Sequence, residues 1–161
     1  MLALDVYRNK KFQNYVMSSF TVSTEVKVDI FHAWEYYFNQ ISTWWPKDYY
    51  TSAKTKKFII DTFIGGKAYE DHGEGGGLIW GDVIGVDYPN SLQLKGSLTK
   101  EFGGPATTYE KFFFEEVTGG TRLSYTADFI GVTSERSIQS LKDGWSDLLK
   151  VHFKAYCTNK G

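Results

Sequence analysis

The chain has 161 residues, of which 42% are hydrophobic and 17% aromatic, and its formal net charge at pH 7 is -1. These values fit one compact domain that buries its own core without disulfides or metals. The balanced charge excludes nucleic acid and an anionic membrane surface as primary partners, because both select basic proteins. The single Cys157, the lack of a signal-peptide pattern and the lack of about 18 consecutive apolar residues predict a soluble protein in a reduced, cytoplasmic setting.

The first 28 residues divide into two parts. Residues 1–15 have mixed polarity and weak periodicity. Three alternatives stay open for them: a frayed lead-in, a short helix, or an arm on a partner chain in a homodimer. From Tyr15 to Val28, mostly apolar residues alternate with mostly polar ones, which predicts a long strand with one apolar face. We therefore expect a single domain over residues 16–161, whose sheet begins with this strand.

Two short helices should follow the first strand. Asp29 can cap a helix over residues 30–40. Its apolar residues recur at helical spacing and are Phe31, Trp34, Tyr37, Phe38 and Ile41. A second helical turn holds Ile41, Trp44 and Trp45 and ends at Pro46, because proline cannot continue it.

The middle of the chain is typical of an antiparallel meander with about six strands. The strand-like runs cover residues 58–64, 67–72, 78–87, 91–98, 107–117 and 121–130. Glycine-rich turns at 65–66, 73–77 and 119–120, and Pro89-Asn90, separate these runs as hairpin connections do.

The segment 134–157 predicts one long helix, because nothing inside it breaks a helix. Thr133 or Ser134 can cap its first turn, and Glu135 suits the positive end of the helix dipole. At about 100° per residue, one apolar stripe contains Ile138, Leu141, Trp145, Leu148, Leu149, His152 and Tyr156. The helix would have about 24 residues and a length on the order of 36 Å. This order of elements indicates an α+β fold, in which a curved antiparallel sheet wraps around the C-terminal helix.

Six short motifs occur in the order in which a known family has them. They are 26–29 (VKVD) leading into Ala33-Trp34, then Trp44-Trp45, Gly65-Gly66, 81–84 (GDVI) with 86–89 (VDYP) and Leu92, 119–123 (GGTRL), and Gly144-Trp145 with Leu148-Leu149. Over residues 16–157 the chain resembles the Hsp90-ATPase-activator-homologue-like (AHSA1-like) branch of the START/Bet v 1 (SRPBCC) superfamily. The resemblance implies a helix-grip fold with a cavity between sheet and helix. It also implies that many relatives bind hydrophobic or amphipathic small molecules, while some are cyclases or hydrolases and others bind proteins, so the fold does not settle the function.

Four polar residues are candidates for such a cavity, and two of them, His152 and Glu110, have an equally simple structural explanation. His152 would be a ligand contact or a general base, or else a core histidine bonded to a backbone or tyrosine group. Glu110 shares its parity with Phe112, and pointing inward it would be a desolvated carboxyl with a raised pKa. The opposite register, with Glu110 in solvent, fits the sequence about as well. Glu70 and His72 would line the cavity mouth.

Aromatic residues supply most of the remaining candidates. The chain has five Trp, eleven Tyr and twelve Phe, most of which are simply core residues. Those in segments that converge on the long helix are Trp44, Trp80, Phe112, Tyr125 and Trp145, and Leu149 lies on the helix itself. A cavity with these walls suits a flat, mostly apolar ligand.

Catalytic and cofactor motifs are absent from the sequence. Its His residues and Cys157 lack metal-ligand spacing, residues 65–67 are not a phosphate loop, and there is no Gly-x-Ser-x-Gly elbow. We therefore predict no metal, no cofactor, and a protein that binds a hydrophobic or amphipathic small molecule without chemistry of its own. The alternatives are a cyclase- or hydrolase-type enzyme that uses the same cavity, and a protein-interaction module.

Overall fold

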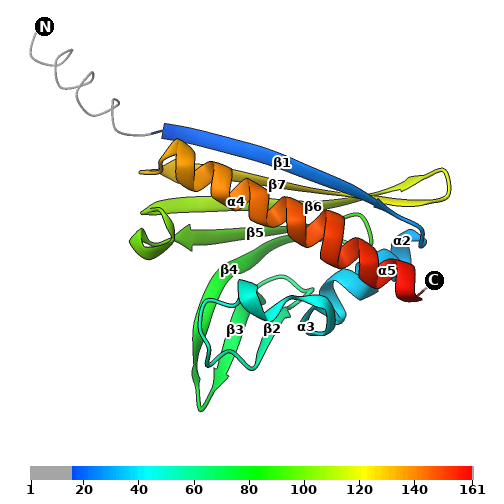
Figure 1. The fold of residues 1–161 in the computed structure, drawn as a ribbon, viewed down its shortest axis with the longest axis horizontal. Coiled ribbons are helices and arrows are strands. Elements are labelled where there is room, and N and C mark those ends of the chain that lie inside the picture. Colours follow the sequence, from blue (N-terminus) through cyan, green and yellow to red (C-terminus); the bar gives the residue numbers. More distant parts are fainter. Residues whose placement is uncertain (1–15, 161) are drawn as a thin grey trace, which may run out of the picture.

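The computed structural model describes residues 16–160, so the alternatives for residues 1–15 lie outside the described part of the chain. Residues 16–160 form a seven-stranded antiparallel sheet with the order β1-β7-β6-β5-β4-β3-β2 (Figure 1). The strands are β1 Val16–Val26, β2 Lys57–Ile60, β3 Lys67–Gly73, β4 Gly76–Asp87, β5 Ser91–Leu98, β6 Ala106–Val117 and β7 Gly120–Gly131. The predicted antiparallel meander is confirmed, and β1 closes it by pairing with β7 along its whole length.

The period-2 pattern of β1 places its apolar side chains on the inner face. Phe20, Val22 and Val26 are buried there, together with Thr24, whereas the intervening residues are exposed. This agrees with the predicted strand.

The strand β2 is shorter than the predicted run 58–64. Two hydrogen bonds close a turn at its end: Asp61 N–H donates to the Lys67 carbonyl at 2.9 Å, and the Asp61 carboxylate accepts from Lys67 N–H at 2.9 Å. The chain therefore leaves the sheet after Ile60, and Phe63 and Ile64 are exposed.

The helices α2 (Ile30–Trp34) and α3 (Ile41–Trp44) follow β1, joined by a π-helical segment, η1 (Glu35–Asn39). Asp29 caps α2 as predicted, because its carboxylate accepts a hydrogen bond from His32 N–H at 2.9 Å. Phe31, one of the apolar residues that recur at helical spacing, lies outside the buried face of α2. The inner face of α2 consists of Ile30, Ala33 and Trp34, and Phe31 is 54% exposed.

The long C-terminal helix is continuous and consists of α4 (Glu135–Asp147), the π-helical η4 (Leu148–Phe153) and α5 (Lys154–Lys160). Ser134 caps it by accepting from Ser137 N–H at 3.1 Å. The wider turns of η4 shift the helical phase, so that Phe153 and Cys157 are buried in line with Trp145 and Leu149. The prediction that His152 lies inside the buried stripe is therefore wrong, since its side chain is 36% exposed.

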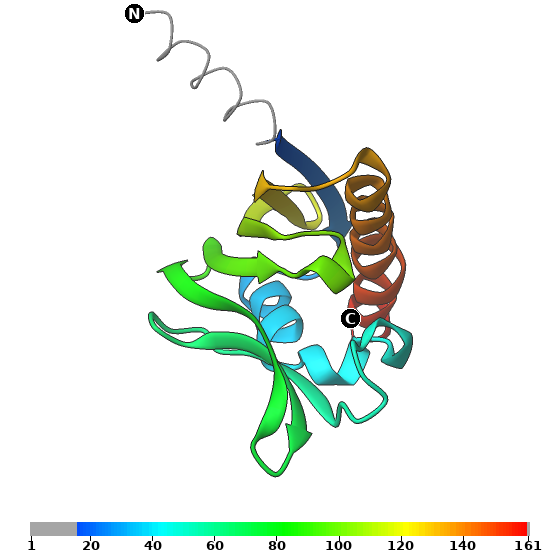
Figure 2. The ribbon, with the colours of Figure 1, turned by 90° about the vertical axis from the view of Figure 1, so that its left-hand side faces the viewer.

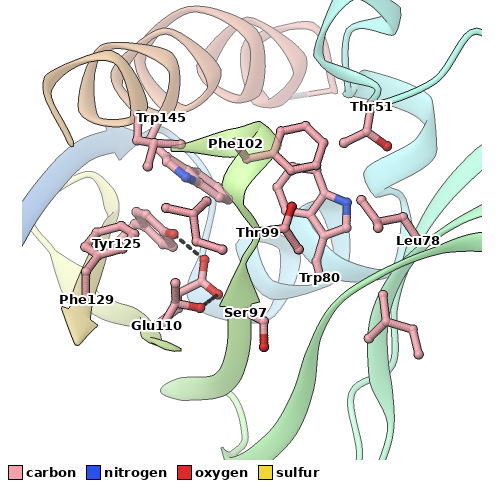
Figure 3. A pocket seen from close by; sticks show the side chains of 14 residues that line it. Thr51, Leu78, Trp80, Ser97, Thr99, Phe102, Glu110, Tyr125, Phe129 and Trp145 are labelled. Atoms are coloured by element: carbon pink, nitrogen blue, oxygen red, sulfur yellow. Dashed lines mark hydrogen bonds between the residues drawn. The ribbon is translucent and has the colours of Figure 1, made fainter. Parts of the chain in front are cut away.

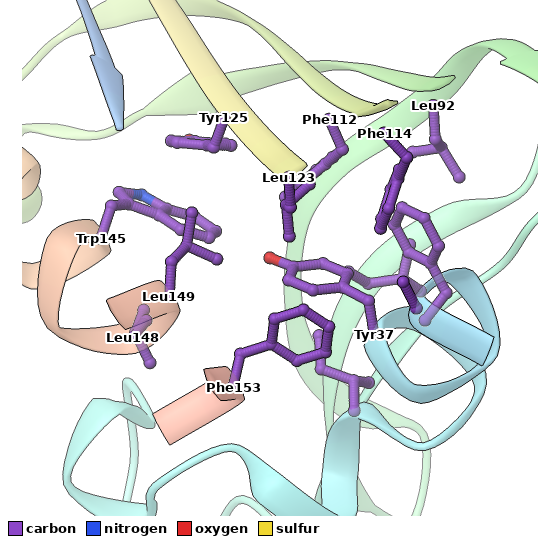
Figure 4. Close-up of a cluster of buried hydrophobic side chains, with 14 of the residues drawn as sticks. Tyr37, Leu92, Phe112, Phe114, Leu123, Tyr125, Trp145, Leu148, Leu149 and Phe153 are labelled. Atoms are coloured by element: carbon purple, nitrogen blue, oxygen red, sulfur yellow. The ribbon is translucent and has the colours of Figure 1, made fainter. Parts of the chain in front are cut away.

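The sheet curves around one side of the long helix, and α2 and α3 close one end of the space between them (Figures 1 and 2). Aromatic side chains fill this closed end. Tyr37 of η1 packs against Phe112, with ring centroids 5.1 Å apart, and against Phe153 of η4 at 5.1 Å (Figure 4). The predicted helix-grip architecture is confirmed, and the open end of the same space holds the candidate site.

Candidate functional site

An apolar cavity of about 180 Å³ lies between the sheet and α4 (Figure 3). One side is formed by β6, β7 and α4 and consists of Thr108, Glu110, Tyr125, Phe129, Leu141 and Trp145. The other side is formed by Thr51, by Leu78, Ile79 and Trp80 of β4, by Ser97 and Leu98 of β5, and by Thr99 and Phe102 at the short helix η3 (Lys100–Phe102). Ile79, Ser97, Thr99 and Phe102 are exposed, so this second side forms the mouth.

Stacked aromatic rings form the inner wall. The rings of Tyr125 and Trp145 lie 3.8 Å apart between centroids, with an interplanar angle of 23°. Trp145 is 7% exposed and also packs edge-on against Trp45 at 5.8 Å. On the mouth side, Trp80 is held by Phe58 at 5.1 Å. The two walls present flat apolar faces to the space between them.

One carboxyl group, that of Glu110, interrupts the apolar lining. Glu110 lies on the inner face of β6 with Thr108 and Phe112. The Tyr125 hydroxyl donates to Glu110 Oε1 at 2.5 Å, and the Thr108 hydroxyl lies 3.4 Å from Oε2. The Glu110 side chain is partly exposed, and its exposed part faces the cavity.

Burial controls the titration of this group and of the phenols near it. Removal from bulk water raises the pKa of the Glu110 carboxyl, and the hydrogen bonds from Tyr125 and Thr108 lower it by less. The pKa of Tyr125 is raised by burial, by the charge of Glu110 and by the hydrogen bond to it. Burial and the charge of Glu110 likewise raise the pKa of Tyr37. Both phenols therefore stay protonated at neutral pH.

The second buried carboxylate, Glu70, lies behind the mouth and does not line the cavity. Its side chain accepts hydrogen bonds from Thr51 N–H at 3.0 Å, from the Thr51 hydroxyl at 2.7 Å and from the Thr55 hydroxyl at 2.6 Å. Trp80 donates to it through its indole N–H at 3.3 Å. Glu70 thus joins the loop at 51–55 to the mouth residue Trp80.

His72 extends this group of polar residues. Its Nε2 atom lies 3.8 Å from Glu70 Oε2, too far for a hydrogen bond. Within residues 16–160, Nε2 is buried without a hydrogen-bond partner. His72 and Glu70 are therefore neighbours, as their shared strand predicted, but they lie beside the cavity rather than in its wall.

The other proposed residues occupy three different places. Trp80, Glu110, Tyr125 and Trp145 line the cavity. Trp44, Phe112 and Leu149 are buried in the core that closes its inner end. His152 lies on the outer side of the long helix, where its Nε2 is 3.2 Å from Asp147, a carboxylate that also accepts from the Tyr49 hydroxyl at 2.7 Å.

The sequence reasoning missed several lining residues. Thr108 and Phe129 were detectable, because they share strand faces with Glu110 and Tyr125. Thr51, Thr99 and Phe102 come from irregular segments whose path the sequence does not predict. Leu141 was placed in the helical stripe but not in the cavity wall.

No protein-family model and no curated protein sequence matches this chain. Solved structures do match. Protein MLL2253 from Mesorhizobium loti has a TM-score of 0.66 at 15% identity, covering 89% of this chain and 98% of that chain. An AHSA1-like protein from Aeromonas hydrophila has a TM-score of 0.61 at 17% identity, covering 89% and 94%. DynU16, a protein in the dynemicin biosynthetic locus, has a TM-score of 0.59 at 17% identity, covering 80% and 43%.

At these low sequence identities, the structural similarity shows the fold alone. The chain has the helix-grip fold of the START/Bet v 1 class. It shares this fold with the AHSA1-like protein from Aeromonas hydrophila, as the sequence resemblance predicted.

Two further findings concern the described residues. Over 16–160, no helix is both long and apolar enough to cross a membrane. In the same part of the chain, no three His, Cys, Asp or Glu residues are placed to hold a metal ion.

Proposed function

We propose that this protein binds a small hydrophobic or amphipathic molecule in the cavity between the sheet and α4. The observation that carries the proposal is the lining itself, which is apolar apart from one carboxyl group and a few hydroxyls. Ligand sites typically combine apolar walls with a small number of placed polar groups. The fold is consistent with the same function, because the cavity lies between the sheet and the long helix, where the resemblance to START/Bet v 1 proteins implies one.

The size of the cavity limits the ligand. An engineered protein cavity of about 150 Å³ holds benzene, whereas sites for drug-sized ligands span roughly 300–1,000 Å³. At about 180 Å³, this cavity suits a molecule with one or two rings. A larger ligand would require the mouth residues to move.

The neutral two-ring probe 2-naphthylmethanol tests this function by isothermal titration calorimetry. The wild-type protein should bind it saturably at one site. Leu141→Trp places an indole at the cavity wall and should weaken binding at least about tenfold. Val151→Trp is the matched control, because Val151 lies on the same long helix but is exposed and away from the cavity. Equal binding by the two folded variants would place the ligand elsewhere. A wild-type protein that binds neither this alcohol nor an amine or acid of the same two-ring shape would refute the proposal.

An enzyme of the cyclase or hydrolase type is the second candidate, and one observation favours it. The raised pKa of Glu110 and its short hydrogen bond with Tyr125 are typical of a general acid or base. Substrate screening followed by Glu110→Gln would distinguish it. Loss of turnover with unchanged substrate affinity would favour the enzyme over simple binding.

A further inference from the structure

Within residues 16–160, the cavity wall has one acidic residue, Glu110, and no basic residue. Of the lining residues, only Glu110 and Tyr125 titrate, and Tyr125 stays neutral. None of the described residues that line the cavity is Lys, Arg or His. The indole N–H of Trp80 is already engaged by Glu70 at 3.3 Å. A ligand in this space therefore meets one strong acceptor and no cation.

The acceptor capacity of Glu110 is only partly used by the protein. An ionised carboxylate has about four lone-pair positions. Tyr125 occupies one of them at 2.5 Å, and Thr108 approaches another at a long 3.4 Å. The rest of the carboxyl faces the cavity. A hydrogen-bond donor on the ligand, placed among Glu110, Trp145 and Phe129, would occupy a free lone-pair position of the Glu110 carboxylate.

We infer that the ligand is a flat, apolar amine whose protonated nitrogen binds the Glu110 carboxylate while its rings lie between Trp80 and the Tyr125–Trp145 pair. This inference rests on the proposed function. A charge-assisted hydrogen bond is stronger than a neutral one and gains further in an apolar cavity. The aromatic faces around the site also attract a cation. A ligand carboxylate would instead bring a second negative charge to Glu110 without a counter-charge.

Three probes of matched shape and different charge test the inference. They are 2-naphthylmethylamine, 2-naphthylmethanol and 2-naphthoate, titrated calorimetrically at pH 7.5. A hydrogen bond to a charged group typically contributes about 1.5–3 kcal/mol, and about 1.4 kcal/mol is tenfold in affinity. The amine should bind at least about tenfold more tightly than the alcohol, and the naphthoate should bind most weakly.

The variant Glu110→Gln removes the charge but keeps the volume and can still accept from Tyr125. The advantage of the amine over the alcohol should then fall at least about tenfold. Glu116→Gln is the matched control on the same strand, because Glu116 is exposed and does not line the cavity. It should keep the full advantage of the amine.

The outcomes separate this inference from the proposed function. If the alcohol or the naphthoate binds the wild type as tightly as the amine does, the inference is wrong while cavity binding stands. An amine advantage that survives Glu110→Gln also overturns it, because the charge would then lie elsewhere. If none of the three probes binds, the proposed function fails with it. The ranking in the wild type decides the question even if the variant does not fold.

Discussion

Glu110 couples the cavity to protein stability through its protonation. Burial raises the pKa of the Glu110 carboxyl in the folded state above its ordinary value. The folded protein then binds more protons than the unfolded chain, so the contribution of this group is fully present below the unfolded pKa and is lost as pH rises through the folded pKa. Glu110→Gln should therefore raise the melting temperature at pH 7.5, and this gain should shrink toward pH 4. A gain that is constant over this range would show that the charge of Glu110 costs no stability.

Glu70 stabilises the fold, whereas the charge of Glu110 costs stability, because the hydrogen bonds of Glu70 hold the mouth of the cavity together. Glu70→Ala would leave the Thr51 backbone N–H, the Thr55 hydroxyl and the Trp80 indole N–H without their acceptor. Each unsatisfied buried donor costs roughly 1–3 kcal/mol, so the free energy of unfolding should fall by about 3 kcal/mol or more in urea titrations. The exposed Glu116→Ala should change it by less than about 0.5 kcal/mol. Equal small effects in both variants would mean that water replaces these bonds.

The sequence predicted which residues could carry chemistry better than it predicted which residues they contact. Strand alternation left both faces of β6 open for Glu110, and the structure places it on the inner face. Its hydrogen bond with Tyr125 depends on the register between β6 and β7, which local alternation does not give. The hydrogen bonds of Glu70 reach across 19 residues to Thr51 in an irregular loop, and no local pattern indicates such a contact. The mouth was therefore the least predictable part of the candidate site.

At the scale of elements, Trp145 joins the long helix to the sheet. It is 7% exposed and stacks on Tyr125 with 3.8 Å between ring centroids. Trp145→Ala should reduce the free energy of unfolding by about 3–5 kcal/mol. Trp145→Phe keeps most of the apolar volume and should cost less than half as much. Val151→Ala, at an exposed position of the same helix, should melt near the wild type. Thermal unfolding distinguishes these cases, and a Trp145→Ala variant that melts within a degree or two of the wild type would contradict the packing.

The existence of the long helix was predictable, and its phase was not. Helical spacing and the Ser134 cap located the element correctly. The π-helical turns of η4 then brought Phe153 inward, where it packs 5.1 Å from Tyr37. Tyr37 itself lies in the other π-helical segment, η1. Wide turns in two helices that meet each other reflect tertiary packing rather than local propensity, so a fixed rotation per residue placed His152 on the wrong side.

At the scale of the whole molecule, the strands behind the inner wall of the cavity have more strand pairing than the segments at its mouth. The strands β6 and β7 are each 12 residues long and have neighbours on both sides. In contrast, β2 is a four-residue edge strand. Glu110 and Tyr125 lie on the well-paired strands, whereas Phe102 lies in the short η3 turn at the exposed mouth. Local opening should therefore be easiest on the mouth side.

Hydrogen exchange with and without 2-naphthylmethylamine tests this division. In the free protein, amides in the middle of β6 and β7 should exchange most slowly and those of β2 among the fastest, because exchange follows the free energy of local opening. The probe should slow exchange most at the amides of Phe102, Gly103 and Gly104, whose hydrogen bonds to the carbonyls of Thr99 and Lys100 hold the η3 turn. These bonds can break without disturbing the sheet, so a ligand that touches Phe102 adds its binding energy to a local equilibrium. Uniform slowing along the chain would instead mean that the ligand stabilises only the whole fold and that the mouth does not open separately.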